Sequence, residues 1–185
     1  MDNVIAVAVN ENNIKPHELA VVTELKPDFL PHATLVQAEG QKALLYSYEG
    51  LSPLAFYGDG NGGMSLTLLF GLLTGYIKCL LRARDMLLDT RLLSSDPEAG
   101  VFVMKESKTS VIVKAVWGAD TVAGDGEKIC RVAQALAGRE RVMGAKISME
   151  RTIELVRSEN LSLAACLKAA EKMCREWNHI TAANT

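Results

Sequence analysis

A glycine-rich loop is the segment whose residue types most directly suggest chemistry. Residues 58–63, Gly-Asp-Gly-Asn-Gly-Gly, match the G-x-G-x-x-G pattern that binds dinucleotides when it leads into a helix. Met64 and Ser65 follow, so the loop also resembles a phosphate-binding loop in which methionine replaces the lysine. That lysine supplies the cation for the outer phosphates, and Asp59 adds a negative charge instead. A turn-forming loop is therefore the favoured interpretation.

The alternative is an anion bound where this loop enters the next helix. Backbone N–H groups at a helix N-terminus attract negative charge, which makes Gly60, Gly62, Gly63 and Ser65 the candidates. Both nucleotide-binding motifs need a parallel strand-helix-strand setting, whereas the segments before this loop have a hairpin pattern. The sequence therefore predicts no bound cofactor, and anion binding at these four positions is the remaining possibility.

Other residues with catalytic potential are scattered along the chain. His17, His32 and His179 stand apart from one another and from any candidate nucleophile. No G-x-S-x-G nucleophile elbow occurs. Three acids near the ends of predicted elements are expected to cap or to face solvent: Asp89, Asp96 and Asp120. We therefore predict no catalytic residue from the sequence.

The cysteines do not have the spacing of a metal site. None of the pairs among Cys79, Cys130, Cys166 and Cys174 forms C-x-x-C, and a zinc site would need tighter clustering. We expect all four to be reduced and mostly buried. The sequence therefore predicts no metal centre.

Composition excludes several classes of protein. The 185 residues are 49% hydrophobic and 23% charged, which is typical of a globular domain rather than a disordered chain. The net charge of −2 gives no general attraction to nucleic acid or to acidic lipid. Residues 1–60 alone carry a net charge of −5, which is either a solvated face or a surface for a basic partner. The N-terminus lacks the basic region of a secretory signal, so we expect a cytoplasmic protein.

The elements that would position these residues begin with strands. Residues 18–24, 33–38 and 41–48 are β-rich, and Glu39-Gly40 between the last two is a hairpin signal. The gaps leave no room for crossover helices, so these segments predict an antiparallel meander. Residues 50–63 are expected to be loop.

A long helix over residues 65–88 is the strongest prediction. Apolar residues surround most of it, which indicates a central, buried element. Its apolar run of about fourteen residues, 64–77, is shorter than the roughly twenty needed to cross a membrane, so no insertion is expected. Small residues recur every fourth position, which predicts close packing within the fold or a homodimer contact: Thr67, Gly71, Gly75, Cys79 and Ala83.

Strands and helices alternate little in the second half of the chain. Residues 101–104 and 110–115 predict a second β-hairpin, and helices are expected over 127–137, 149–158 and 163–177. Segregated strands and helices favour an α+β fold. We expect one domain over 1–178, which divides into a strand-rich region over residues 1–60 and a helical region over residues 61–178. A polar tail or linker is expected at 179–185.

This order of elements is similar to a reduced protein-kinase fold. The stretch 92–100 follows the long helix, where a kinase has its catalytic loop, and Val116-Trp117-Gly118 stands where a kinase has Asp-Phe-Gly. Residues 44–48, 85–89 and 101–103 also resemble a bacterial domain that precedes forkhead-associated (FHA) domains. The same residues resemble the pseudokinase-like cytoplasmic domain of type VII secretion membrane components. In that group a Leu-Leu-Tyr strand precedes a helix ending near Tyr-Leu-Leu-Asp, and this chain has Met86-Leu-Leu-Asp89.

The departures from a kinase concern the charged groups. Val116 cannot hold magnesium, and Ser95 or Asp96 would occupy the position of the base without the His-Arg partner. Lys42 is the only strand lysine in the first hairpin, and it sits near the strand edge. The resemblance therefore implies a catalytically silent fold with little capacity for phosphoryl transfer.

Two classes of function follow. The first is a non-catalytic scaffold that binds a protein partner in bacterial signalling or secretion assembly, with apolar residues such as Phe102 and Trp117 filling the cleft between its halves. The alternative is a nucleotide- or anion-binding protein or enzyme that uses loop 58–63, with convergent polar groups in that cleft.

Overall fold

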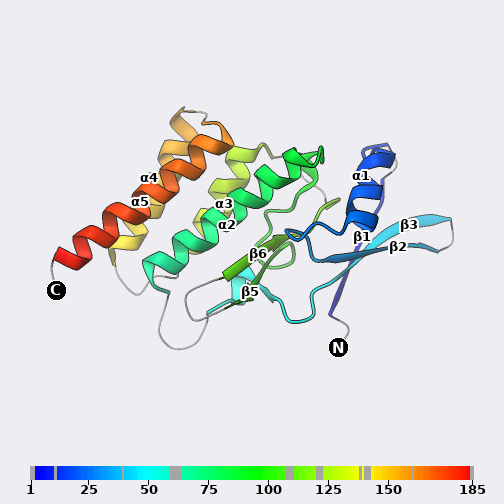
Figure 1. Ribbon diagram of the computed structural model, residues 1–185, viewed down its shortest axis with the longest axis horizontal. Helices are drawn as coiled ribbons and strands as arrows, with labels where there is room; N and C mark the ends of the chain where they lie inside the picture. Colours follow the sequence, from blue (N-terminus) through cyan, green and yellow to red (C-terminus); the bar gives the residue numbers. More distant parts are fainter. Residues whose placement is uncertain are drawn as a thin grey trace.

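The fold contains two antiparallel three-stranded sheets and a group of helices, which confirms the α+β class. The computed structural model describes residues 3–10, 12–38, 40–58, 64–106, 111–119, 123–137, 139, 143–159 and 161–183. One sheet has the strand order β1-β3-β2 and the other β4-β5-β6. Figure 1 places the first sheet and α1 at one end, the helices α2 to α5 at the other, and β5 and β6 between them.

The first sheet is built from β1 (Val4–Ala8), β2 (His32–Ala38) and β3 (Gln41–Ser47). The hairpin of β2 and β3 confirms the strands predicted over 33–38 and 41–48, while Glu39 lies outside the described residues. β1 pairs with the far side of β3, so the sheet is antiparallel but is not a simple meander. β1 was not predicted, although its sequence Val-Ile-Ala-Val-Ala is rich in strand formers.

The strand predicted over 18–24 is wrong. This segment forms α1 (Pro16–Ala20), which continues into a π-helical turn, Val21–Leu25. Pro16 stands at the start of α1, and the carboxylate of Glu18 accepts the backbone N–H of Lys15 at 2.8 Å. Burial of Val22 in the core then outweighs the strand preference of its β-branched neighbours.

The described part of the predicted loop 50–63 contains regular structure. β4 (Ser52–Pro53) pairs with β5 (Val101–Lys105), and a 3₁₀ turn, Leu54–Phe56, follows it. β5 and β6 (Val111–Ala115) form the second predicted hairpin, which is confirmed.

The central helix α2 spans Leu66–Asp85 and confirms the long predicted helix. It ends three residues early because the chain turns at Leu87, whose φ of 59° is left-handed, and the Leu88 N–H bonds back to the Ala83 carbonyl. Its length and composition would also suit a membrane span, but half of its most apolar window is buried inside the fold. A core helix meets the same criteria, so the absence of membrane insertion stays a prediction.

The stripe of small residues on α2 packs in part against the second sheet. A Cβ at Gly75 would lie 2.7 Å from Cγ2 of Val113, and the Cys79 thiol donates to the Val113 carbonyl at 3.3 Å. This contact explains Gly75 and Cys79 within one chain. A Cβ at Gly71 would meet nothing within 4 Å, so a homodimer contact through Gly71 and Gly75 stays a prediction.

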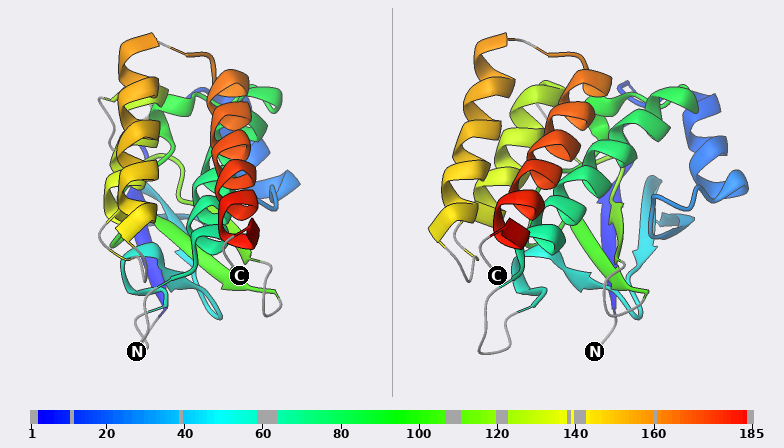
Figure 2. Two further views of the ribbon diagram at one scale, coloured as in Figure 1. Left: turned by 90° about the vertical axis from the view of Figure 1, so that its left-hand side faces the viewer. Right: turned by 60° about the vertical axis from the view of Figure 1, so that its left-hand side comes forward.

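Helices α3 (Asp125–Ala137), α4 (Met143–Glu159) and α5 (Leu163–Ala183) confirm the three predicted C-terminal helices. Figure 2 shows α2 to α5 running alongside one another. α4 begins earlier than predicted. α5 extends through most of the stretch 179–185 that was expected to be a polar tail, because the alanine-rich sequence continues the helix.

Candidate functional site

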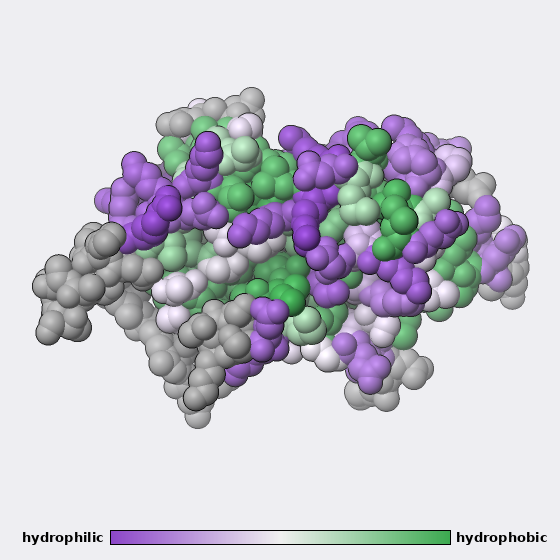
Figure 3. Space-filling model, viewed as in Figure 1, coloured by the Kyte–Doolittle hydropathy of each residue, from purple (hydrophilic) through white to green (hydrophobic). Residues whose placement is uncertain are grey.

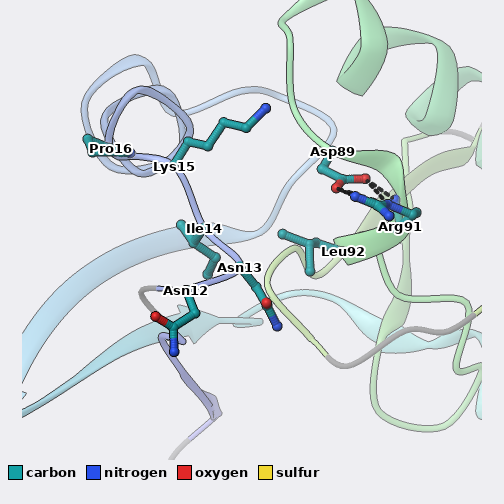
Figure 4. Close-up of a pocket in the computed structure, with 8 residues that line it drawn as sticks. All are labelled: Asn12, Asn13, Ile14, Lys15, Pro16, Asp89, Arg91 and Leu92. Carbon is teal, nitrogen blue, oxygen red and sulfur yellow. Dashed lines mark hydrogen bonds and ion pairs between the residues drawn. The ribbon is translucent and has the colours of Figure 1, made fainter.

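A pocket of about 520 Å³ lies where the first sheet meets the helical half of the molecule. The chain between β1 and α1 forms one wall, and the connection from α2 to β5 forms the other. Figure 4 shows the two walls facing each other. The lining is mainly polar or charged: Asn12, Asn13, Ile14, Lys15, Pro16, Asp89, Arg91 and Leu92.

Asp89, the acid in this pocket, forms an ion pair with its neighbour Arg91. Arg91 donates two bonds from Nε and Nη2 to Oδ2 of Asp89, at 3.0 and 2.7 Å. The same carboxylate caps the 3₁₀ turn Thr90–Leu92 by accepting the Arg91 backbone N–H. Arg91 therefore holds the pKa of Asp89 below its ordinary value. An ionised, paired carboxylate is a poor general base or acid at neutral pH.

A second acid, Glu18, joins the two walls of the pocket. Its side chain is 1% exposed, and its two oxygens accept the backbone N–H groups of Lys15 at 2.8 Å and of Asp89 at 2.7 Å. The carboxylate thus connects the start of α1 to the end of α2. Because both oxygens are used by backbone donors, Glu18 has a structural role here.

Lys128 on α3 holds the α2–β5 connection in place through hydrogen bonds to its backbone. Its side chain is buried, and Nζ donates to the carbonyls of Thr90, Arg91 and Leu93 at 2.6, 2.8 and 2.6 Å. Burial lowers the pKa of Lys128 to about 8, so the ammonium form, with three donors for three carbonyls, prevails at neutral pH. This lysine is therefore committed to holding the loop.

The two segments matched to kinase motifs lie side by side. Ser94 N–H donates to the Val116 carbonyl at 2.8 Å, and Gly118 N–H donates to the Leu92 carbonyl at 2.9 Å. Trp117 in the second segment is fully buried, and its carbonyl accepts the Tyr46 hydroxyl at 2.7 Å. The contact is thus made of backbone bonds and apolar side chains.

The residues at the positions of a kinase base serve the local chain. Asp96 accepts the backbone N–H of Glu98 at 2.8 Å and so stabilises its own turn. Ser95 is buried, and the Tyr76 hydroxyl donates to the carbonyl of neighbouring Ser94 at 3.0 Å. Gly100 faces Ser94 so closely that a Cβ there would lie 1.8 Å from Oγ. These contacts pack the inner side of the turn within the chain, while Asp96 itself is exposed.

The anion-binding candidates are only partly described. Gly60, Gly62 and Gly63 lie outside the described residues. Ser65 caps α2, and its Oγ accepts the Leu68 N–H at 3.3 Å. The structure therefore gives Ser65 a capping role.

The other flagged side chains are dispersed. His17 lies 3.4 Å from the Leu87 carbonyl, and His32 is exposed on β2. The side chain of His179 and all of Asp120 are outside the described residues. Among the described residues, no group of three histidine, cysteine or acidic side chains could hold a metal ion. Three thiols are buried and the fourth is half-buried, which confirms the expectation that the cysteines are mostly buried: Cys79, Cys130, Cys166 and Cys174.

Sequence reasoning missed the two charged residues that organise this site. Glu18 was assigned to a strand, although an acid two residues after Pro16 is typical of a helix start. Lys128 lies on a helix whose neighbours Ile129 and Cys130 are buried, but nothing in its spacing distinguishes it from a surface lysine. Its carbonyl partners come from a distant loop, so only the tertiary structure could reveal the role.

No protein-family model matches this chain, and no curated protein matches its sequence.

Proposed function

We propose that this chain is a non-catalytic protein-interaction or scaffold domain with a degenerate kinase-like fold. It would act in the cytoplasm, in bacterial signalling or secretion assembly. The observation that carries the proposal is that buried apolar side chains fill the junction between the two halves. Val116 and Trp117, which the resemblance matches to the kinase metal-binding motif, are buried and bound through the backbone to the loop matched to the catalytic loop.

The charged groups at this junction support the same conclusion. Lys128 and Glu18 are buried and bound to backbone atoms, and Asp89 is paired with Arg91. A phosphoryl-transfer site needs carboxylates and a lysine directed at metal and phosphate. Here the charged groups at the junction bind backbone atoms or one another, while Phe102 and Trp117 are buried, as the scaffold hypothesis expects.

The exposed surface is compatible with binding proteins. The face drawn in Figure 3 mixes hydrophobic and hydrophilic residues over both halves of the molecule. Non-obligate protein interfaces have about the same apolar share as ordinary protein surface, so such a mixed face suits a reversible partner.

A thermal-shift titration with ATP and GTP, with and without Mg²⁺, tests the silent character of this fold. A ligand at a hundred times its Kd would add about 2.7 kcal/mol of stability, which is easily detected, and we expect no shift. A shift that requires Mg²⁺ would contradict the proposal. A shift without Mg²⁺ that Lys15→Ala and Arg91→Ala abolish would favour the anion-binding alternative, at the pocket rather than at loop 58–63.

A substitution of Asp96, the residue matched to the kinase base, distinguishes a scaffold from an enzyme in a cellular complementation assay. Asp96→Asn retains an acceptor for the turn but removes the acid that the resemblance matches to the catalytic base. We expect the variant to complement a deletion strain as well as the wild-type chain does. Loss of complementation by a folded, normally expressed Asp96→Asn chain would contradict a non-catalytic function.

A further inference from the structure

In the part of the chain that the structure describes, no strand pairs with the outer edge of β1. β1 pairs with β3 on one side and is the outermost strand of its sheet. The N–H of Val9 and the carbonyl of Asn3 bond to β3 and to the residue that follows it, at 2.8 and 2.9 Å. Backbone direction alternates along a strand, so the N–H and C=O groups of Val4, Ala6 and Ala8 point away from β3.

The three residues that face this edge are exposed. Val4 is 44% exposed, and Ala6 and Ala8 fall in the same exposed class. At the opposite edge of the sheet, the turn Val21–Leu25 contacts β2. β1, by contrast, makes its main contact among the described elements with β3.

β1 lacks the features that normally prevent edge pairing. Natural edge strands are protected by charges, proline or bulges, whereas Val4–Ala8 is an uninterrupted apolar strand. On the outer face of the sheet, Ala6 lies in one row with Leu45 of β3 and Thr34 of β2. This row carries no charge that would repel another sheet.

The sequence of β1 is complementary to itself in the antiparallel direction. A two-fold axis at Ala6 sets Ala6 opposite its copy and Val4 opposite Ala8 of the second chain. These are the residues whose backbone groups point outward, so each pair can exchange two hydrogen bonds. The small side chain at the centre allows close approach on the outer face. The same axis sets Ile5 opposite Val7 on the inner face.

We propose that β1 pairs antiparallel with β1 of a second copy of this chain, joining two three-stranded sheets into one six-stranded sheet. The contact is isologous, as a two-fold dimer requires. It is separate from the small-residue stripe of α2. It goes beyond the proposed function and does not depend on it, because a scaffold or an enzyme could equally be dimeric.

Sedimentation velocity of the full chain over a concentration series tests the pairing. We expect a reversible monomer–dimer equilibrium in the wild type. Ala6→Lys places two ammonium groups face to face at the two-fold axis, so we expect its dimer Kd to rise at least about tenfold. Thr34→Lys is the matched control, because it adds the same charge to the same row of the sheet at the far edge. We expect it to leave the Kd within about threefold, and circular dichroism checks that both variants fold.

A cross-linking experiment tests the register independently of stability. Opposed Cα atoms in such a pair lie about 5.5 Å apart, which a disulfide can span. Under mild oxidation Ala6→Cys should form a covalent dimer, whereas the wild type and Thr34→Cys should not. A chain that is monomeric at every soluble concentration would overturn the proposal. A dimer that Ala6→Lys leaves intact would overturn it as well, and would direct attention to Gly71.

Discussion

The α2–β5 connection and strand β1 differ in how they satisfy their backbone polar groups. In the connection, the carbonyls of Thr90, Arg91 and Leu93 all accept hydrogen bonds from one buried lysine. The Asp89 N–H donates to the carboxylate of Glu18. In β1, three residues direct N–H and C=O groups to solvent. In the first region these backbone groups are bound within the chain, whereas in the second they remain available for hydrogen bonds to another chain. Judged by residue types alone, the polar α2–β5 connection would be taken as the binding region and apolar β1 as part of the core.

Removing the lysine is expected to have the largest effect on this contrast. Lys128→Met keeps the length of the side chain but leaves three carbonyls without their donor. We expect the free energy of unfolding to fall by about 3 kcal/mol or more, because an unsatisfied buried polar group costs about 1–3 kcal/mol. Urea denaturation followed by tryptophan fluorescence measures it. Lys172→Met, at a side chain that is 73% exposed, is the control and should change stability by less than about 0.5 kcal/mol. Equal effects of the two substitutions would contradict the role of Lys128.

Two glycines on α2 also contrast a position packed within the chain with an open one: Gly75 lies against Val113, whereas Gly71 has no neighbour within 4 Å of an added Cβ. Gly75→Ala would push a methyl group into Val113 and should destabilise the fold by about 1–3 kcal/mol. Gly71→Ala meets no atom within 4 Å and should stabilise the helix by up to about 1 kcal/mol. Differential scanning calorimetry should therefore show Tm changes of opposite sign. A lower Tm for Gly71→Ala would indicate that Gly71 packs against a second chain, which would revive the homodimer contact through the stripe.

The sequence predicted the elements whose pattern is local. The helix over 65–88 and the strands of 101–104 and 110–115 have strong periodicity, and each formed within a few residues of its expected bounds. The segment 18–24 failed because β-branched residues favour a strand only when a sheet is available to them, and here Val22 is buried from a helical turn.

The candidate site was harder to predict than the elements. The buried roles of Glu18 and Lys128 depend on backbone groups 71 and 35 to 38 positions away in sequence, which no local pattern encodes. The junction filled by Trp117 was expected from the resemblance to a silent kinase-like fold. The open edge of β1 could not be predicted, because it depends on what the far side of β1 meets in the folded chain, which no local pattern encodes.

The smallest expected effect concerns the ion pair at the pocket, which also belongs to the internally satisfied region. Because Arg91 lowers the pKa of Asp89, the folded chain keeps this carboxylate ionised at a pH where the unfolded chain, with a pKa of about 3.9, binds a proton. The contribution is therefore fully present above about pH 5 and is lost as the pH falls through the folded pKa. Asp89→Asn retains the cap but cannot ionise. Urea denaturation of both chains from neutral pH down to pH 3 should show a stability difference that is constant above about pH 5 and shrinks below about pH 4. Other carboxylates titrate equally in both chains and cancel in this difference, so a difference independent of pH would show that the Asp89–Arg91 pair contributes nothing to the folded state.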